Sequence, residues 1–189
     1  MKAPMRPPSL RKDFIWAQLL HLGFTHWKNQ DAIAKARDFE LRVPRPRFDE
    51  SLWVELLERS AAAGMNMVVI DLEAFVRYRS HPELHERGAW TRKKLSRELR
   101  RARSLGLEPI PKLNFSTTHD QWLGKYQLAV STPAYYRVCA DLIREVVDLF
   151  EGPRFFHLGM DEEAGDTSVY DRLVIVRQYD LFWSDLDFF

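Results

Sequence analysis

Short apolar segments alternate with longer amphipathic segments along this chain. The first two apolar segments cover residues 15–24 and 65–71, and the second contains the run Met67-Val68-Val69-Ile70. A short, continuous run rich in β-branched residues is typical of a strand that is buried on both faces of a parallel sheet. Residues 107–115 and 154–159 have the same apolar character. The pattern therefore predicts four strands.

Amphipathic helices are predicted between these strands. Asp49 or Ser51 can cap the first helix, Thr91 the second, and the segment Ser131-Thr132-Pro133 opens the third, with proline in its first turn. A further amphipathic segment covers residues 179–189. A glycine follows each of the first three helices and favours a helix end there: Gly64, Gly106 and Gly152.

The order β-α-β-α-β-α-β-(α) predicts parallel strands joined by right-handed crossovers. Two architectures fit this order, an open doubly wound sheet and part of a (β/α)₈ barrel of the TIM type. No glycine-rich phosphate loop follows the first strand, which disfavours a dinucleotide-binding sheet. A full barrel takes about 250 residues. With 189 residues, we expect an N-terminal tail (1–13) and a partial barrel domain (14–189) holding the first four to five βα units.

Composition narrows the classes of partner. Hydrophobic residues make up 46% of the chain and the net charge is +1, so we expect a globular domain that binds neither nucleic acid nor membrane. No apolar stretch approaches the roughly 20 residues of a membrane span, and no signal peptide precedes the domain. The localisation is undetermined and cytoplasmic by default. Cys139 is the single cysteine, which excludes an internal disulfide.

Polar side chains follow each predicted strand. In a parallel barrel the carboxyl ends of the strands meet on one face, where substrates bind. We therefore expect substrate contacts from this face. The candidates are His26 after the first strand, Asp71 and Glu73 after the second, Asn114 and His119 after the third, and Asp161, Glu162 and Glu163 after the fourth.

Asp161 and Glu162 are the strongest catalytic candidates. They leave the fourth strand through Gly159, where the backbone can bend tightly. Adjacent carboxylates can divide the work of holding a substrate and donating a proton, because crowding of like charge raises one pKa. The same residues also suit the first turn of a helix, and spacing alone slightly favours that role. A magnesium site built with Asp71 is a weaker alternative.

Aromatic residues near the same face could stack on sugar rings, although each one alone is more often part of a core. These candidates are Trp27, Trp90 and Trp122. His21 and His157 are interpreted as structural. The basic segment 92–103 is interpreted as a solvated helix face.

Several motifs resemble those of the family 20 glycoside hydrolases, the β-N-acetylhexosaminidases. The segment Phe155-Phe156-His157-Leu158-Gly159-Met160-Asp161-Glu162 is similar to the family's strand ending in Gly-Gly-Asp-Glu, with Met160 at the second glycine. Residues 80–90 are similar to its loop after the second strand, and residues 102–111 to its approach to the third. The resemblance covers roughly residues 52–163.

The resemblance implies a barrel that releases terminal N-acetylhexosamines with retention, by the substrate-assisted route. By position, Asp161 would orient the acetamido group of the sugar and Glu162 would protonate the leaving oxygen, with no metal or other cofactor. The alternative is a carbohydrate-binding or assembly module derived from such a barrel and without catalysis. An open barrel edge invites self-association in either case.

Overall fold

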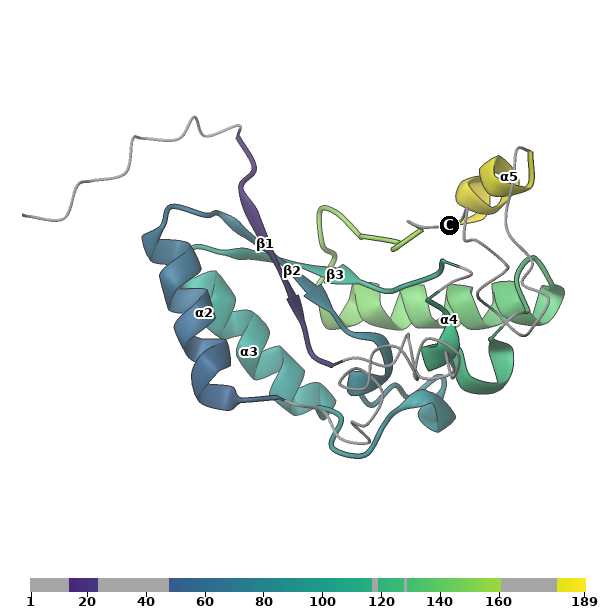
Figure 1. Ribbon diagram of the computed structural model, residues 1–189, viewed down its shortest axis with the longest axis horizontal. Helices are drawn as coiled ribbons and strands as arrows, with labels where there is room; N and C mark the ends of the chain where they lie inside the picture. Colours follow the sequence, from purple (N-terminus) through teal and green to yellow (C-terminus); the bar gives the residue numbers. More distant parts are fainter. Residues whose placement is uncertain (1–13, 24–47, 117–118, 128, 161–179) are drawn as a thin grey trace, which may run out of the picture.

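The computed structural model describes residues 14–23, 48–116, 119–127, 129–160 and 180–189. Its centre is a parallel sheet of three strands in the order β1-β2-β3, with all three running in the same direction (Figure 1). The strands are β1 (Ala17–His21), β2 (Met67–Asp71) and β3 (Glu108–Lys112). They lie inside three of the four predicted segments, and each is a few residues shorter than predicted.

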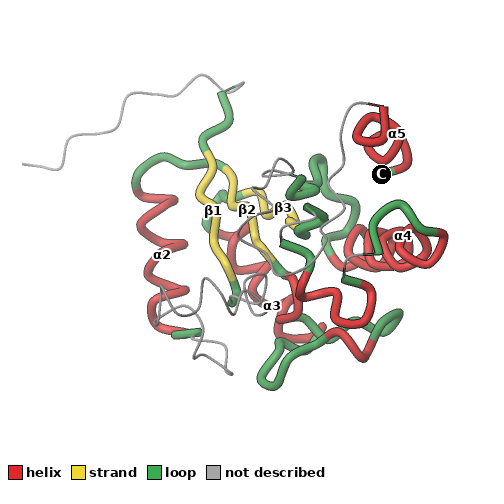
Figure 2. Tube along the Cα trace, turned by 45° about the vertical axis from the view of Figure 1, so that its right-hand side comes forward, coloured by secondary structure: helices red, strands yellow, loops and turns green. Residues whose placement is uncertain are grey.

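Three long helices follow the capping signals in the sequence. They are α2 (Glu50–Ala62), α3 (Arg92–Ser104) and α4 (Pro133–Leu149). Their N-caps are Asp49, Thr91 and Thr132, and each cap side chain accepts hydrogen bonds from backbone N–H groups of the first turn. Figure 2 shows α2 and α4 flanking the sheet, and the apolar sides of α2, α3 and α4 pack against one of its faces. The predicted helix starts are confirmed.

Short helices fill the connections after the strands. They are the 3₁₀ helices η1 (Glu73–Phe75), η2 (Pro82–Leu84) and η3 (Gln121–Tyr126). Near the end of the chain, α5 (Asp180–Phe188) covers most of the segment predicted as a final helix. In the part of the chain that the structure describes, no helix is long and apolar enough to cross a membrane.

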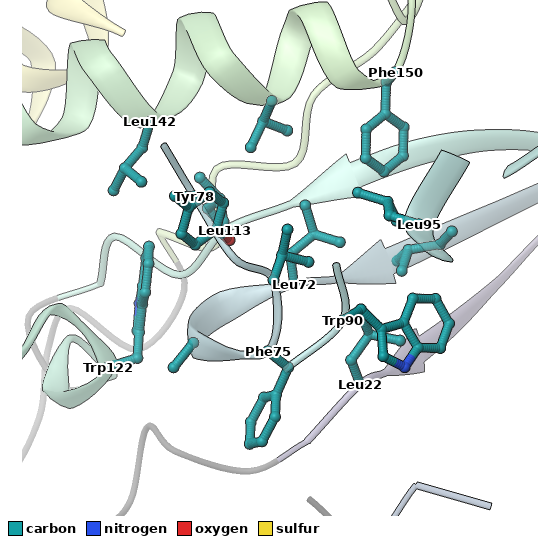
Figure 3. Close-up of a cluster of buried hydrophobic side chains, with 14 of the residues drawn as sticks. Leu22, Leu72, Phe75, Tyr78, Trp90, Leu95, Leu113, Trp122, Leu142 and Phe150 are labelled. Atoms are coloured by element: carbon teal, nitrogen blue, oxygen red, sulfur yellow. The ribbon is translucent and has the colours of Figure 1, made fainter. Parts of the chain in front are cut away.

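The main hydrophobic core lies between the sheet and its helices. Alternate strand residues such as Leu20, Val68 and Ile70 point into this core, where they meet apolar side chains of the three long helices. Figure 3 shows Leu142 of α4 and Phe150, the residue that follows α4, pointing toward it. The buried apolar residues of α4 follow helical spacing, as Val138, Leu142 and Val146 show, whereas Leu52 at the start of α2 is 50% exposed.

The other face of the sheet carries the intervening residues. Leu19, Val69 and Ile110 lie side by side in register, and Val69 and Ile110 form a second small apolar cluster with Met67. Two residues further along each strand, on the same face, the register brings His21, Asp71 and Lys112 together. This second face therefore changes from apolar to polar at the carboxyl ends of the strands.

The predicted fourth strand, residues 154–159, is only partly formed. Lys112 and His157 make a single parallel bridge, and Leu113 N donates to His157 O over 3.1 Å. In a parallel strand, alternate residues direct N–H groups to the same neighbour. The residues of β3 that share the direction of Leu113 are Pro109 and Pro111, which have no N–H to donate. Pairing with β3 is therefore limited to the isolated bridge at His157.

The predicted (β/α)₈ barrel corresponds, among the described residues, to a mixed helix and strand fold with a small parallel sheet and no closed barrel. His157 was interpreted as structural, in the core of the fourth strand. The core placement is wrong, because the residue is exposed, although its Nδ1 accepts a hydrogen bond from Gly159 N over 3.0 Å. His26, Trp27, Asp161, Glu162 and Glu163 lie outside the described residues.

Candidate functional site

A row of polar side chains crosses the sheet at the carboxyl ends of the strands. His21 ends β1, Asp71 ends β2 and Lys112 ends β3, each on the face opposite the helices. His21 Nδ1 lies 3.0 Å from Asp71 Oδ2, and Lys112 Nζ donates to the same oxygen over 2.8 Å. Asp71 is therefore the centre of the row, held by one neighbour from each adjacent strand.

Asn114 extends this row beyond the end of β3. Its Nδ2 donates to Asp71 Oδ2 over 3.1 Å and also to Glu73 Oε1, while its Oδ1 accepts from Lys112 Nζ. Asp71, Glu73, Lys112 and Asn114 are all buried. Together with the half-exposed His21 they form what we call the strand-end network.

Glu73 is held in an uncommon backbone conformation. Its φ is 36°, a value in the left-handed region that residues other than glycine rarely adopt. The hydroxyl of Tyr78 donates to the Glu73 carbonyl over 2.7 Å and helps to fix it. Strained residues persist where the surroundings hold them in place, and they are concentrated at functional sites.

Burial and charge act against each other at Asp71. Burial raises the pKa of this carboxyl group, but the hydrogen bond from His21 and the positive charge of Lys112 outweigh it, so the pKa stays below its ordinary value. Tyr78 shows the opposite result. Burial, followed by the negative charges of Asp71, Glu73 and Glu145, raises its pKa well above the ordinary value. Asp71 is therefore ionised near neutral pH, and Tyr78 keeps its proton.

One oxygen of Asp71 has an unused capacity for hydrogen bonding. All the contacts described above are made to Oδ2, and Oδ1 is buried without a hydrogen-bond partner among the described residues. A buried acceptor left unpaired costs about 1–3 kcal/mol, and more when it carries charge. Oδ1 is therefore a place where a donor from a ligand or a water molecule would be stabilising.

Gly159 brings the segment 157–160 against Asn114. Ser116 N donates to Gly159 O over 3.1 Å, and Phe115 N donates to Leu158 O over the same distance. Gly159 has a φ of 59°, and a Cβ atom there would approach the Asn114 side chain and come within 2.6 Å of Leu113 O. Only glycine fits this bend. Asp161 follows two residues later in the sequence.

The structure brings together three of the predicted candidates, Asp71, Glu73 and Asn114. Trp90, predicted to contact substrate, lies elsewhere: its ring packs in the core at 5.3 Å from Trp53 and 4.7 Å from Phe48, centroid to centroid. Only 4% of Trp90 is exposed. The Lys94 ammonium also lies over the Trp90 ring, 5.0 Å from its centroid, so packing in the core explains this tryptophan.

Trp122 and His119 lie closer to the strand-end network, in the loop after β3. Trp122 is buried, and its indole N–H donates to the backbone oxygen of Asn114 over 2.7 Å, so it supports Asn114 from the core side. His119 is also buried, and its backbone N–H donates to Ser116 O. Both residues position the loop that carries Asn114.

Sequence reasoning missed Lys112 and interpreted His21 as structural. The sequence held only a weak signal for both, since each is a polar residue inside a predicted strand segment, and the strand ends that align them with Asp71 come from the structure. Among the described residues, no group of three or more His, Cys, Asp or Glu side chains is arranged to hold a metal ion. The ammonium of Lys112 occupies the position beside Asp71 where a cation would be expected.

Comparisons with solved structures show a consistent likeness. The chain is similar to a mutant Streptomyces plicatus β-hexosaminidase in complex with its product GlcNAc, with 16% identity, a TM-score of 0.56, and coverage of 81% of this chain and 34% of that one. It is also similar to Flavobacterium johnsoniae chitobiase, with 18% identity, a TM-score of 0.56, and coverage of 83% of this chain and 25% of that one.

A third similar structure is the GH20 β-N-acetylhexosaminidase of Streptomyces coelicolor, with 14% identity, a TM-score of 0.53, and coverage of 81% of this chain and 34% of that one. This chain therefore spans about a third or less of these proteins. No family model matches the sequence. No curated protein matches it either. At this identity the likeness shows a glycoside hydrolase-like fold and carries no activity with it.

Proposed function

We propose that this chain carries a glycoside hydrolase site of the β-N-acetylhexosaminidase kind, which binds a terminal N-acetylhexosamine at the carboxyl ends of its strands. The observation that supports it most is the strand-end network, in which Asp71 and Asn114 meet beside the segment that leads to Asp161 and Glu162. The likeness of the fold to hexosaminidases of known structure supports the same proposal.

In the proposed site, the network holds the sugar and the acidic pair performs the reaction. Asp71 Oδ1 accepts a hydrogen bond from a hydroxyl group of the sugar, which removes the cost of an unpaired buried acceptor. The acetamido oxygen of the substrate attacks the anomeric carbon, as in the substrate-assisted exception to the two-carboxylate scheme.

The acidic pair has two different roles in this proposal. Asp161 orients and polarises the acetamido group, and Glu162 donates its proton to the glycosidic oxygen as the bond to the leaving group breaks. Glu162 then takes a proton from the water that opens the cyclic intermediate. The protein needs no metal ion for these steps, because both carboxylates act directly on the substrate.

Turnover of a chromogenic N-acetylglucosaminide tests the proposal. We expect the variant Glu162→Gln to lose activity by at least about 100-fold, the scale of general acid catalysis. Glu163→Gln is the matched control, since it removes the next carboxylate in the sequence, and it should keep most of the activity. Unchanged turnover in Glu162→Gln would exclude the assignment of this residue as the acid.

A carbohydrate-binding module without catalysis is the second candidate. The likeness to the hexosaminidases is one of fold alone, at 14% to 18% identity, and a fold of this kind can bind a sugar without cleaving it. Saturable binding of N-acetylglucosamine with no turnover of the chromogenic substrate would establish this function instead. Turnover that disappears only after exhaustive EDTA treatment would indicate a magnesium-dependent hydrolase.

A further inference from the structure

Lys112 contacts two members of the strand-end network at the same time. It lies at the end of β3 on the face opposite the helices, and its side chain is only 7% exposed. Two of the three ammonium donors go to Asp71 Oδ2 and Asn114 Oδ1. A lysine buried in this way is rare unless its charge is paired, and here Asp71 provides the pair.

We infer that Lys112 is a positioning residue of the site, which engages Asp71 Oδ2 and Asn114 Oδ1 and so leaves Asp71 Oδ1 to accept a hydrogen bond from a neutral ligand such as a sugar. The inference deepens the proposed function and rests on it for the identity of the ligand as a sugar. The arrangement of the side chains does not depend on that identity.

The orientation of the Asn114 amide follows from the chemistry of lysine. An ammonium group can only donate, so the atom of Asn114 that faces it must be the acceptor Oδ1. The donor Nδ2 then points toward the carboxylates of Asp71 and Glu73, where both of its hydrogen bonds are made. Lys112 therefore sets which end of the amide meets the acidic side chains.

The charges of the network lead to the same conclusion. Asp71 faces Lys112, His21 and the amide of Asn114. The same amide contacts the Glu73 carboxylate, and the Tyr78 hydroxyl donates to the Glu73 backbone carbonyl. Lys112 is the permanent cation of this group. Its removal leaves a buried carboxylate without its main counter-charge, which favours protonation of Asp71.

Carbon-detected NMR on the whole chain tests the inference directly. The carboxyl carbon of Asp71 and the side-chain amide of Asn114 are followed through a pH titration in the wild type, in Lys112→Met and in Lys125→Met. Lys125 is the matched control, because its side chain is 66% exposed. We expect Lys112→Met to raise the midpoint of the Asp71 titration and to shift the Asn114 amide signals, whereas Lys125→Met leaves both unchanged.

A binding titration with N-acetylglucosamine is the second arm. We expect affinity to fall at least about tenfold in Lys112→Met, the scale of one charge-assisted hydrogen bond, and to be retained in Lys125→Met. Wild-type protein that fails to bind the sugar would overturn the proposed function, and the NMR arm would still decide the role of Lys112. Unchanged Asp71 and Asn114 signals in Lys112→Met would overturn the inference.

A variant that keeps the site neutral covers the case in which Lys112→Met does not fold. The double variant Asp71→Asn/Lys112→Met removes both charges of the buried pair, and such neutral replacements are often tolerated. We expect the Asn114 amide signals of the double variant to differ from those of Asp71→Asn, because only the double variant lacks the Lys112 ammonium. The same Asn114 signals in both variants would show that Lys112 does not orient the amide.

Discussion

His21 Nδ1 lies 3.0 Å from Asp71 Oδ2, in a contact that joins the ends of two neighbouring strands. The contact exists because parallel pairing places the last residue of β1 beside the last residue of β2, with both side chains on the same face. Lys112 reaches the same oxygen from β3. A buried carboxylate that is held from both sides has consequences for stability as well as for binding.

The ionised Asp71 should make stability depend on pH in the acid range. Its pKa is lowered in the folded state, so the stabilisation is fully present above the ordinary aspartate value of about 3.9 and is lost as pH falls through the lower folded value. Urea unfolding over this range measures the effect. In Asp71→Asn, the unfolding free energy should depend less on pH in this range. An unchanged dependence would show that the pKa of Asp71 is not lowered in the folded state.

The same variant should be less stable near neutral pH. Asp71→Asn leaves the Lys112 ammonium buried without its charge partner, a change that costs about 3–5 kcal/mol when one member of a buried pair is removed. Asp141→Asn is a suitable control, because Asp141 is half-exposed in its pair with Arg144. Equal unfolding free energies for the two variants would contradict the buried pair.

Gly159→Ala should disrupt the contact between residues 157–160 and Asn114. The added Cβ would come within 2.6 Å of Leu113 O at a φ of 59°. Gly106→Ala is the matched control, since Gly106 also has a positive φ, of 79°, but nothing within 4 Å of the added atom. We expect the control to lose about 1 kcal/mol of unfolding free energy and Gly159→Ala clearly more. Equal losses would show that Gly159 has room.

Glu145 should stabilise the loop after β2. Its carboxylate accepts hydrogen bonds from the backbone N–H groups of Arg79 and Ser80 and from the Arg92 side chain. Glu145→Ala should lower the unfolding free energy by about 1.5–3 kcal/mol, the scale of hydrogen bonds to a charged group. Glu151→Ala, which removes an exposed partner of Arg103, should change it by less than about 0.5 kcal/mol.

Trp90 is a core residue and Trp183 a surface residue, so replacing each by alanine should have different effects on stability. Trp90 is packed against Trp53 and Phe48, whereas Trp183 is 63% exposed. Trp90→Ala should cost about 3–5 kcal/mol of unfolding free energy, and Trp183→Ala should cost little. Sugar affinity measured on folded protein should be the same in both variants. A Trp90→Ala variant of normal stability with lost affinity would restore the stacking role.

The sheet face opposite the helices should drive self-association. Leu19 on β1 and Phe155 near β3 are exposed apolar side chains, and exposed apolar groups that lie close together mark contact surfaces. Light scattering after size exclusion should show an apparent mass that rises with concentration. Leu19→Lys should reduce this rise, and a clean monomer at every concentration would contradict association through this face.

Local signals in the sequence were sufficient for the helices. Asp49, Thr91 and Thr132 cap their helices as predicted, because a cap depends only on a side chain and the next few backbone groups. The strand residues Met67 to Asp71 were equally clear. Their burial on both faces requires a continuous apolar run, which the sequence shows directly.

The fourth strand and the site needed information from distant residues. The gap in pairing before His157 arises from Pro109 and Pro111 on the neighbouring strand, so it was invisible in residues 154–159 themselves. Lys112 became a site residue only through its register with Asp71. The choice between a stacking role and a core role for Trp90 also depended on distant residues, since the neighbours that bury it, Trp53 and Phe48, are far from it in sequence.

A crystal structure of the chain soaked with N-acetylglucosamine tests the central claim most directly. The proposed site predicts a sugar hydroxyl within hydrogen-bond distance of Asp71 Oδ1, with the Asp161 and Glu162 carboxylates on the same sugar. A sugar bound elsewhere, or an acidic pair far from Asp71 and Asn114 with the sugar in place, would contradict it.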